Sequence, residues 1–143
     1  MAEDKKKEID VRVIEVTDEY IKEKVKKIRG KRVLLDADLA EIYGYDTKGF
    51  NRQVKNNIEK FDEDFMFELT DEELEDLRYK NCTANISSKS RYNPHVFTEQ
   101  GLYMLMTVLK GPLAVKQSKA LIRTFKKMKD YILENRDLIA LFI

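Results

Sequence analysis

The sequence has few of the residues on which several classes of protein depend. It contains one cysteine, Cys82, and one histidine, His95, among its 143 residues. One cysteine excludes an internal disulfide and a zinc site built from several cysteines, and one histidine disfavours most hydrolase triads and His-rich metal sites. No run approaches the roughly 18 uncharged apolar residues of a membrane span, and the charged start lacks the hydrophobic region of a signal peptide. We therefore expect a small soluble protein of the cytoplasm.

The motifs that commonly mark enzymes and metal sites are also lacking. The sequence has no Gly-rich phosphate loop, no pair of cysteines and no spacing of histidine with acids that suits a metal. His95 follows a proline and precedes two apolar residues, and no nucleophile is spaced to use it. We expect no catalytic residue, no metal ligand and no cofactor.

Charge is abundant and unevenly distributed. The net charge is +1, yet residues 22–32 carry a local +6, residues 59–76 carry a local −9, and residues 110–129 contain seven basic residues and no acid. Such blocks allow a folded chain of nearly zero net charge to present one basic face. They are equally compatible with solvated helix faces, so the counts alone assign no binding partner.

Apolar spacing and turn residues predict an α+β fold: a helix-rich single domain with a helix-turn-helix-like pair, a small β-sheet and a long C-terminal helix. We expect a leader with an N-terminal strand in residues 1–18, a domain over 19–111 and a C-terminal helix within 112–143. Expected helix caps are Asp18, Asp36, Asp46 or Thr47, Thr70 and Thr98, and Gly44 is the expected end of a helix. The predicted strands cover 9–16, 32–35, 65–69 and 94–97, and the predicted helices cover 19–28, 37–43, 47–57, 71–79, 99–109 and 113–133.

The helix pair between Asp38 and Val54 is the strongest candidate for a binding element. Ala40 and Gly44 are small enough to let two helices cross closely. In the second helix, Phe50 and Val54 fall on the side that would pack inward. The polar side of the same helix gathers Lys48, Asn51, Arg52 and Lys55 within an arc of roughly 100°.

This polar side has the composition of a helix that reads duplex DNA. Lysine and arginine contact phosphates or guanine, and asparagine pairs with adenine. Thr47 and the first-turn amides suit a phosphate at the helix N-terminus. An amphipathic helix whose polar side meets only water has the same pattern, so the pattern alone does not decide.

Two further basic segments bear on the same question. Lys89 and Arg91 lie in a Ser-rich stretch that we expect to be a wing or arm against DNA, or else a solvated loop. The last helix has an apolar stripe that suits a core or a homodimer seam, and a basic reverse side that suits phosphates or solvent. The stripe consists of Ala114, Leu121, Phe125, Met128 and Ile132, and the basic side of Lys116, Lys119, Arg123, Lys126 and Lys127. The apolar residues 138–143 either pack in a homodimer or mark a boundary within a longer protein.

Several separated motifs resemble, in the right order, the phage ORF-six N-terminal domain, a relative of the KilA-N and Bro-N domains. They are IRGKRVLLDADLAEIYG at 28–44, then Thr47-Lys48, Asn51, VKNN at 54–57 and Phe61, then DFMFELT at 64–70 and YNPHVFTEQG at 92–101. The resemblance covers about residues 20 to 110. Asp62 and His95 depart from the family pattern, away from the polar helix side.

The resemblance implies a non-catalytic DNA-binding module of a phage or prophage transcription regulator, acting at the nucleoid in the cytoplasm of a bacterial or phage-infected cell. It implies double-stranded DNA as the partner, contacted at the matching positions Thr47, Lys48, Asn51, Arg52 and Lys55. One alternative is an antirepressor-like protein-interaction module that binds another regulator through the acidic residues 59–76. Another is a structural remnant without a specific ligand.

Overall fold

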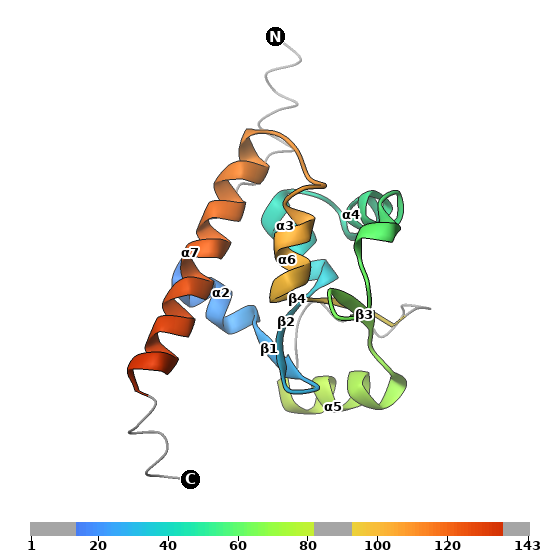
Figure 1. Ribbon diagram of the computed structural model, residues 1–143. Coiled ribbons are helices and arrows are strands. Elements are labelled where there is room, and N and C mark those ends of the chain that lie inside the picture. Colours follow the sequence, from blue (N-terminus) through green and yellow to red (C-terminus); the bar gives the residue numbers. More distant parts are fainter. Residues whose placement is uncertain (1–13, 82–92, 136–143) are drawn as a thin grey trace.

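The structure is a computed structural model that describes residues 14–81 and 93–135. Over these two ranges the chain forms six α-helices and four strands (Figure 1). They are α2 (Asp18–Lys24), β1 (Lys26–Ile28), β2 (Lys31–Leu35), α3 (Asp36–Tyr43), α4 (Thr47–Lys55), β3 (Met66–Glu68), α5 (Asp71–Asn81), β4 (His95–Thr98), α6 (Glu99–Leu105) and α7 (Pro112–Glu134). A 3₁₀ turn, η1 (Ile58–Lys60), follows α4. The predicted α+β fold with a small sheet and a long C-terminal helix is confirmed.

The four strands form one antiparallel sheet in the order β1-β2-β4-β3. The apolar strands β2 and β4 are central, and the three-residue strands β1 and β3 are the edges. A two-residue turn joins β1 to β2, and both of its residues have positive φ, 56° at Arg29 and 75° at Gly30. This conformation matches the twist of paired strands, which is why such turns close tight hairpins.

Each face of the sheet has its own hydrophobic core because side chains alternate along a strand. Val33, Leu35 and Val96 pack against Leu74 and Leu77 of α5. On the opposite face, α3, α4, α6 and α7 cover the second and larger core. Its central buried residues include Leu34, Phe50, Phe97, Leu102 and Phe125. Of the described helices, α5 alone lies on its side of the sheet in Figure 1.

The predicted N-terminal elements are partly wrong. The helix expected over 19–28 ends at Lys24, and its cap is Thr17, whose hydroxyl accepts the Tyr20 amide hydrogen at 3.1 Å. Residues 26–28 are instead a strand because pairing with β2 outweighs local preference. Of the strand expected over 9–16, residues 9–13 lie outside the described ranges, and residues 14–16 are not in a strand.

Smaller corrections concern other helix ends. Leu35 is the cap residue of α3, and Asp36 is its first helical residue rather than its cap. The helix expected over 47–57 ends at Lys55. The helix expected over 99–109 ends at Leu105, where the chain turns and buries Val108 and Leu109. The loop expected over 81–93 lies largely outside the described ranges.

Several predicted caps are confirmed. Thr70 and Glu73 form a reciprocal capping box: the Thr70 amide donates to Glu73 Oε1 at 2.9 Å, and the Glu73 amide donates to Thr70 Oγ1 at 3.1 Å. The Thr98 hydroxyl caps α6 by accepting from the Gly101 amide. Gly44 ends α3 with φ of 79°, a conformation that favours glycine.

The long helix α7 is packed along the domain through both apolar and polar contacts. Of its predicted apolar stripe, Ala114, Leu121 and Phe125 are buried, whereas Ile132 is 45% exposed. The Tyr43 hydroxyl and Ser118 Oγ are 2.7 Å apart, and burial raises the pKa of Tyr43 to about 12. The Gln117 amide also donates to the backbone carbonyl of Ile42 at 2.8 Å. The start of α7 is thereby fixed to α3.

Candidate nucleic-acid interface

Helix α4 is held in place by its cap and by its inner side. Asp46 is the cap residue, and its Oδ1 accepts the Gly49 amide hydrogen at 2.8 Å. Thr47, the alternative cap, is the first helical residue. Phe50 and Val54 are buried, as predicted, and the Phe50 ring meets the Phe97 ring edge to face with centroids 5.7 Å apart. The helix is therefore anchored directly on the central strand β4.

The outer side of α4 is polar and contains no acid. Lys48, Arg52 and Lys55 are exposed, as is Thr47 in the first turn. Within residues 14–81 and 93–135, no ion pair is recorded for any of the three cations. The structure therefore brings together four of the predicted contact residues on one exposed surface, which we call the α4 surface: Thr47, Lys48, Arg52 and Lys55.

Asn51 is placed differently from these four. It is half-buried, and its Nδ2 donates to Asp36 Oδ2 at 3.1 Å. The same oxygen accepts the backbone N–H of His95 at 3.2 Å, and Asp36 Oδ1 accepts the Ala37 amide hydrogen at 2.7 Å. One buried carboxylate therefore joins the start of α3, the side of α4 and the start of β4.

Sequence reasoning missed this connection. Local pattern indicates only a capping role for Asp36, and Asn51 is 15 positions away from it and His95 is 59. No local pattern in the sequence connects residues that are this far apart. The His95 ring is also near two carboxylates, with Nδ1 4.0 Å from Asp36 Oδ2 and Nε2 4.0 Å from Glu68 Oε1.

The N-terminus of α4 is less suited to a phosphate than the sequence indicates. The carboxylate of Asp46 already occupies the Gly49 amide there, and its negative charge repels an anion. The turn before it is tight: Gly44 has positive φ, and a Cβ at this position would lie 3.1 Å from Leu113 Cδ2. Lys and Arg side chains of the α4 surface are better placed to meet phosphates than the first-turn amides.

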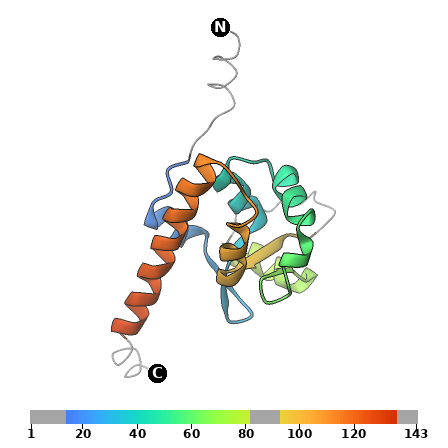
Figure 2. The same ribbon diagram turned by 45° about the horizontal axis from the view of Figure 1, so that its top comes forward.

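The other predicted basic elements do not join the α4 surface in the described structure. Lys89 and Arg91 lie outside the described residues. Helix α7 lies on the opposite side of the domain from α4 in both views (Figures 1 and 2). Its basic side chains are exposed: Lys116, Lys119, Arg123, Lys126 and Lys127. Lys126 and Lys127 form ion pairs with Asp130 and Asp18, each at 2.7 Å.

Neither a metal cluster nor a membrane span occurs in the described ranges. No group of three or more His, Cys, Asp or Glu side chains capable of holding a metal ion is found among these residues. No helix among them is long and apolar enough to cross a membrane.

Comparison with known protein families gives a match over most of the domain. The model of the ORF6N domain family matches residues 23–108, which include the sheet, the α3–α4 pair and α6. Neither a curated protein nor a solved structure matches the chain.

Proposed function

The chain belongs to the ORF6N domain family, and we propose that it is a non-catalytic domain that binds duplex DNA as a transcription regulator of phage or prophage type. One observation carries the proposal: α4 buries its apolar side and presents Lys48, Arg52 and Lys55 to solvent without a recorded acidic partner in the described ranges. Such a regulator acts on a chromosome or phage genome, which places it in the bacterial cytoplasm.

In this proposal α4 enters the major groove as the second helix of a helix-turn-helix-like pair. A helix of nine residues is about 13 Å long, and the groove is about 12 Å wide. Lys48, Arg52 and Lys55 contact phosphates or guanine edges, and Thr47 contacts the backbone near the start of the helix. The helix is anchored on β4 through Phe50, so its outer side chains are presented from a rigid support.

Asn51 has a double role in this proposal. Its donated hydrogen bond orients α4 on Asp36. The bond to Asp36 does not use the side-chain carbonyl oxygen of Asn51 or its second amide hydrogen. These are the two groups that a bidentate contact with adenine needs. We assign phosphate contacts to the α4 surface rather than to α7, because a straight duplex seated on α4 does not reach the far side of the domain.

The first test is fluorescence anisotropy of a labelled random duplex, measured as a function of salt. Each lost phosphate contact flattens the slope of log K against log salt by about 0.9. The variant Lys48→Ala/Arg52→Ala should therefore flatten it by up to about 2. The matched control is Lys116→Ala/Lys119→Ala, which removes the same charge from exposed positions of α7 and should leave the slope nearly unchanged.

Three results would change the proposal in different ways. If the α4 variant and the α7 control lost DNA affinity equally, binding would depend on the total charge of the protein rather than on contacts of α4. Binding unaffected by the α4 variant would move the contact elsewhere. Absence of binding by the folded wild-type protein at low salt would refute DNA binding and favour a protein partner.

We propose that two copies associate through α7, as DNA readers with two-fold symmetry often do. Val115, Ile122 and Leu133 are 53%, 41% and 61% exposed, and their spacing places them on one side of the helix. An Ile122→Glu variant should weaken the association in sedimentation equilibrium. A wild-type protein that stays monomeric at high concentration would refute this part of the proposal.

The alternative function is an antirepressor-like module that binds another regulator. It is favoured by exposed carboxylates on α5, on the sheet face opposite α3, α4 and α7: Asp71, Glu72, Glu75 and Asp76. The variant Glu72→Lys/Glu75→Lys discriminates the two functions. If the acidic surface is the interface with a partner regulator, this variant should abolish binding of that regulator. If α4 is the DNA-binding surface, the variant should not weaken DNA binding.

A further inference from the structure

A hollow of about 700 Å³ lies between the β1–β2 hairpin, the start of α6 and the end of α7. Its walls include Lys27, Lys31 and Arg32 from the hairpin and Lys129 from α7. Among the described residues that line it, Glu99 is the one acid. The volume is in the range of small-molecule sites, which is roughly 300–1,000 Å³.

The single acid is already engaged. Glu99 Oε2 lies 2.7 Å from Lys129 Nζ and accepts the Tyr103 hydroxyl at 2.6 Å. Burial works against ionisation of Glu99, yet these two contacts and the nearby positive charge of Arg32 hold its pKa below the usual value. In the described ranges no ion pair is recorded for Lys27, Lys31 or Arg32. Among the described residues, the hollow therefore has four cations against one acid, an excess of positive charge.

The hairpin places two of these cations directly against each other. Lys27 and Arg32 are opposed partners in the antiparallel register of β1 and β2, on the face toward α6 and α7. Opposed side chains of like charge destabilise a strand pair. An anion between them would remove this repulsion, so its binding gains from an unfavourable contact already present in the fold.

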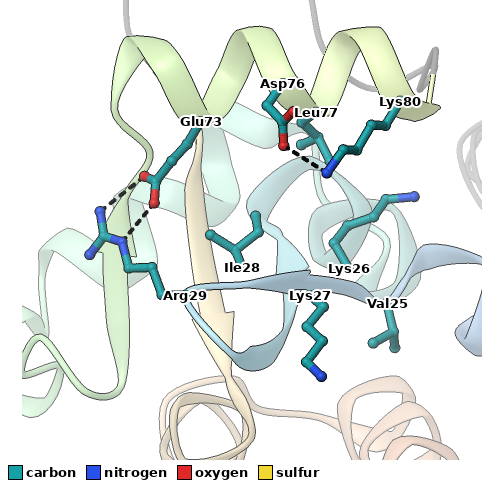
Figure 3. A pocket seen from close by; sticks show the side chains of 9 residues that line it. All are labelled: Val25, Lys26, Lys27, Ile28, Arg29, Glu73, Asp76, Leu77 and Lys80. Carbon is teal, nitrogen blue, oxygen red and sulfur yellow. Dashed lines mark hydrogen bonds and ion pairs between the residues drawn. The ribbon is translucent and has the colours of Figure 1, made fainter. Parts of the chain in front are cut away.

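A second hollow, of about 370 Å³, on the other face of β1 shows the contrast. Figure 3 shows Arg29 paired with Glu73 and Lys80 paired with Asp76, while Lys27 points away from α5. The Arg29 Nε–Glu73 Oε2 distance is 2.8 Å, and the Lys80 Nζ–Asp76 Oδ2 distance is 3.2 Å. On this face two cations, Arg29 and Lys80, are thus paired with acids and only Lys26 lacks a recorded acidic partner in the described ranges, whereas on the other face none of the hairpin cations has one.

We propose that the hollow between the hairpin, α6 and α7 is a second binding site, which takes phosphate groups. Lys27 and Arg32 supply the charge on the face toward α6 and α7, and Lys31 adds a cation at the hairpin end. Arg32 has a guanidinium fork suited to phosphate oxygens. Tyr103, 42% exposed, and Ile132, 45% exposed, add an apolar wall. The phosphates come from a free polyphosphate or nucleotide, or from the backbone of DNA. The site is independent of the α4 surface.

The test is a titration of ¹⁵N-labelled protein with inorganic tripolyphosphate at low salt, followed by amide chemical shifts. We expect saturable shifts at Gly30, Arg32 and Gln100. The variant Lys27→Gln/Lys31→Gln, at two exposed positions, should raise the apparent Kd about tenfold. The control Lys116→Gln/Lys119→Gln removes equal charge from α7 away from the hollow and should leave the Kd unchanged.

Two outcomes would refute phosphate binding in the hollow, and a third would refute its independence of the α4 surface. One is no saturation at tens of millimolar tripolyphosphate. The other is an equal loss of tripolyphosphate affinity in the control variant, which would show that the anion is attracted diffusely to basic surfaces. Shifts retained in a Lys48→Gln/Arg52→Gln variant would separate this site from the proposed DNA contact, whereas shifts lost there would refute its independence.

A competition arm then identifies the source of the phosphates. It uses the Lys48→Gln/Arg52→Gln protein, in which the proposed α4 contact is weakened. Displacement of tripolyphosphate by a 20-base-pair duplex would assign the site to the DNA backbone. Displacement by ATP but not by the duplex would assign it to a free nucleotide.

Discussion

Replacing Asn51 by alanine tests whether the buried carboxylate of Asp36 orients α4. In the native protein Asp36 is 5% exposed, and its Oδ2 accepts hydrogen bonds from Asn51 Nδ2 and from the backbone N–H of His95. The Asn51→Ala variant removes one of these two donors. It leaves the backbone path of α4 and the packing of Phe50 unchanged.

Two effects of opposite sign set the magnitude. A hydrogen bond to a charged group contributes about 1.5–3 kcal/mol, and the lower end applies here because Asn51 is half-buried and water partly replaces its amide. Alanine favours a helix over asparagine by about 0.6 kcal/mol. We therefore expect a net loss of about 1 kcal/mol in the free energy of unfolding, or about 4 °C in Tm.

Urea unfolding followed by far-UV circular dichroism measures this loss. The matched control is Asn56→Ala, at an exposed position just after α4 whose side chain has no recorded hydrogen bond in the described ranges. It should change stability by less than about 0.5 kcal/mol. A double-mutant cycle of Asn51→Ala with Asp36→Ala should give a coupling energy of about 1.5 kcal/mol, because the helix-propensity difference cancels in the cycle.

The reasoning would be refuted if Asn51→Ala were as stable as Asn56→Ala, or if the losses of the double-mutant cycle were additive. DNA binding supplies a second readout under the proposed function. Asn51→Ala should lower the affinity without flattening the salt slope, because no phosphate contact is lost. A flattened slope would show that Asn51 acts through the cations instead.

Three further substitutions have clear expected outcomes. Gly101→Ala would place a Cβ against the Phe65 carbonyl oxygen, and thermal unfolding should show a loss of about 3 kcal/mol; the stabilisation usual for alanine in a helix would contradict this contact. Glu73→Gln keeps the capping box but removes the charge facing Arg29, whose hydrogen bond lowers the Glu73 pKa to about 2. Because that pKa is lowered, the wild type should be more stable than Glu73→Gln by about 1 kcal/mol above pH 5. The difference is small because solvent reaches both side chains and screens their charges. This advantage should shrink between about pH 4.5 and pH 2 in urea titrations, and a pH-independent difference would refute the assignment. Phe50→Ala should cost about 3–5 kcal/mol by the same assay, and a loss below 1 kcal/mol would show that α4 is not anchored through this ring.

Local sequence determined where several helices begin and where α3 ends. The capping box at Thr70 and Glu73, the cap at Thr98 and the glycine at 44 each act within a few residues, so the amino-acid sequence is sufficient to identify them. The same holds for the inner side of α4, because helical periodicity alone places Phe50 and Val54 together. Four of the five predicted contact residues of α4 are exposed on its outer side for this reason.

Contacts between segments far apart in the sequence decided structural features that the local sequence does not predict. Residues 26–28 form a strand because β2 offers them a partner, although a lysine-rich segment favours a helix locally. Asn51 is half-buried on Asp36 rather than wholly exposed, since the carboxylate is supplied from another helix.

The opposition of Lys27 and Arg32, and the hollow beside them, exist only when the hairpin, α6 and α7 meet. Side-chain periodicity is a property of one element and can be read along the chain. Charge balance and burial depend on which elements become neighbours in the fold. In this protein the order of the strands and the packing of α7 determined which elements are neighbours.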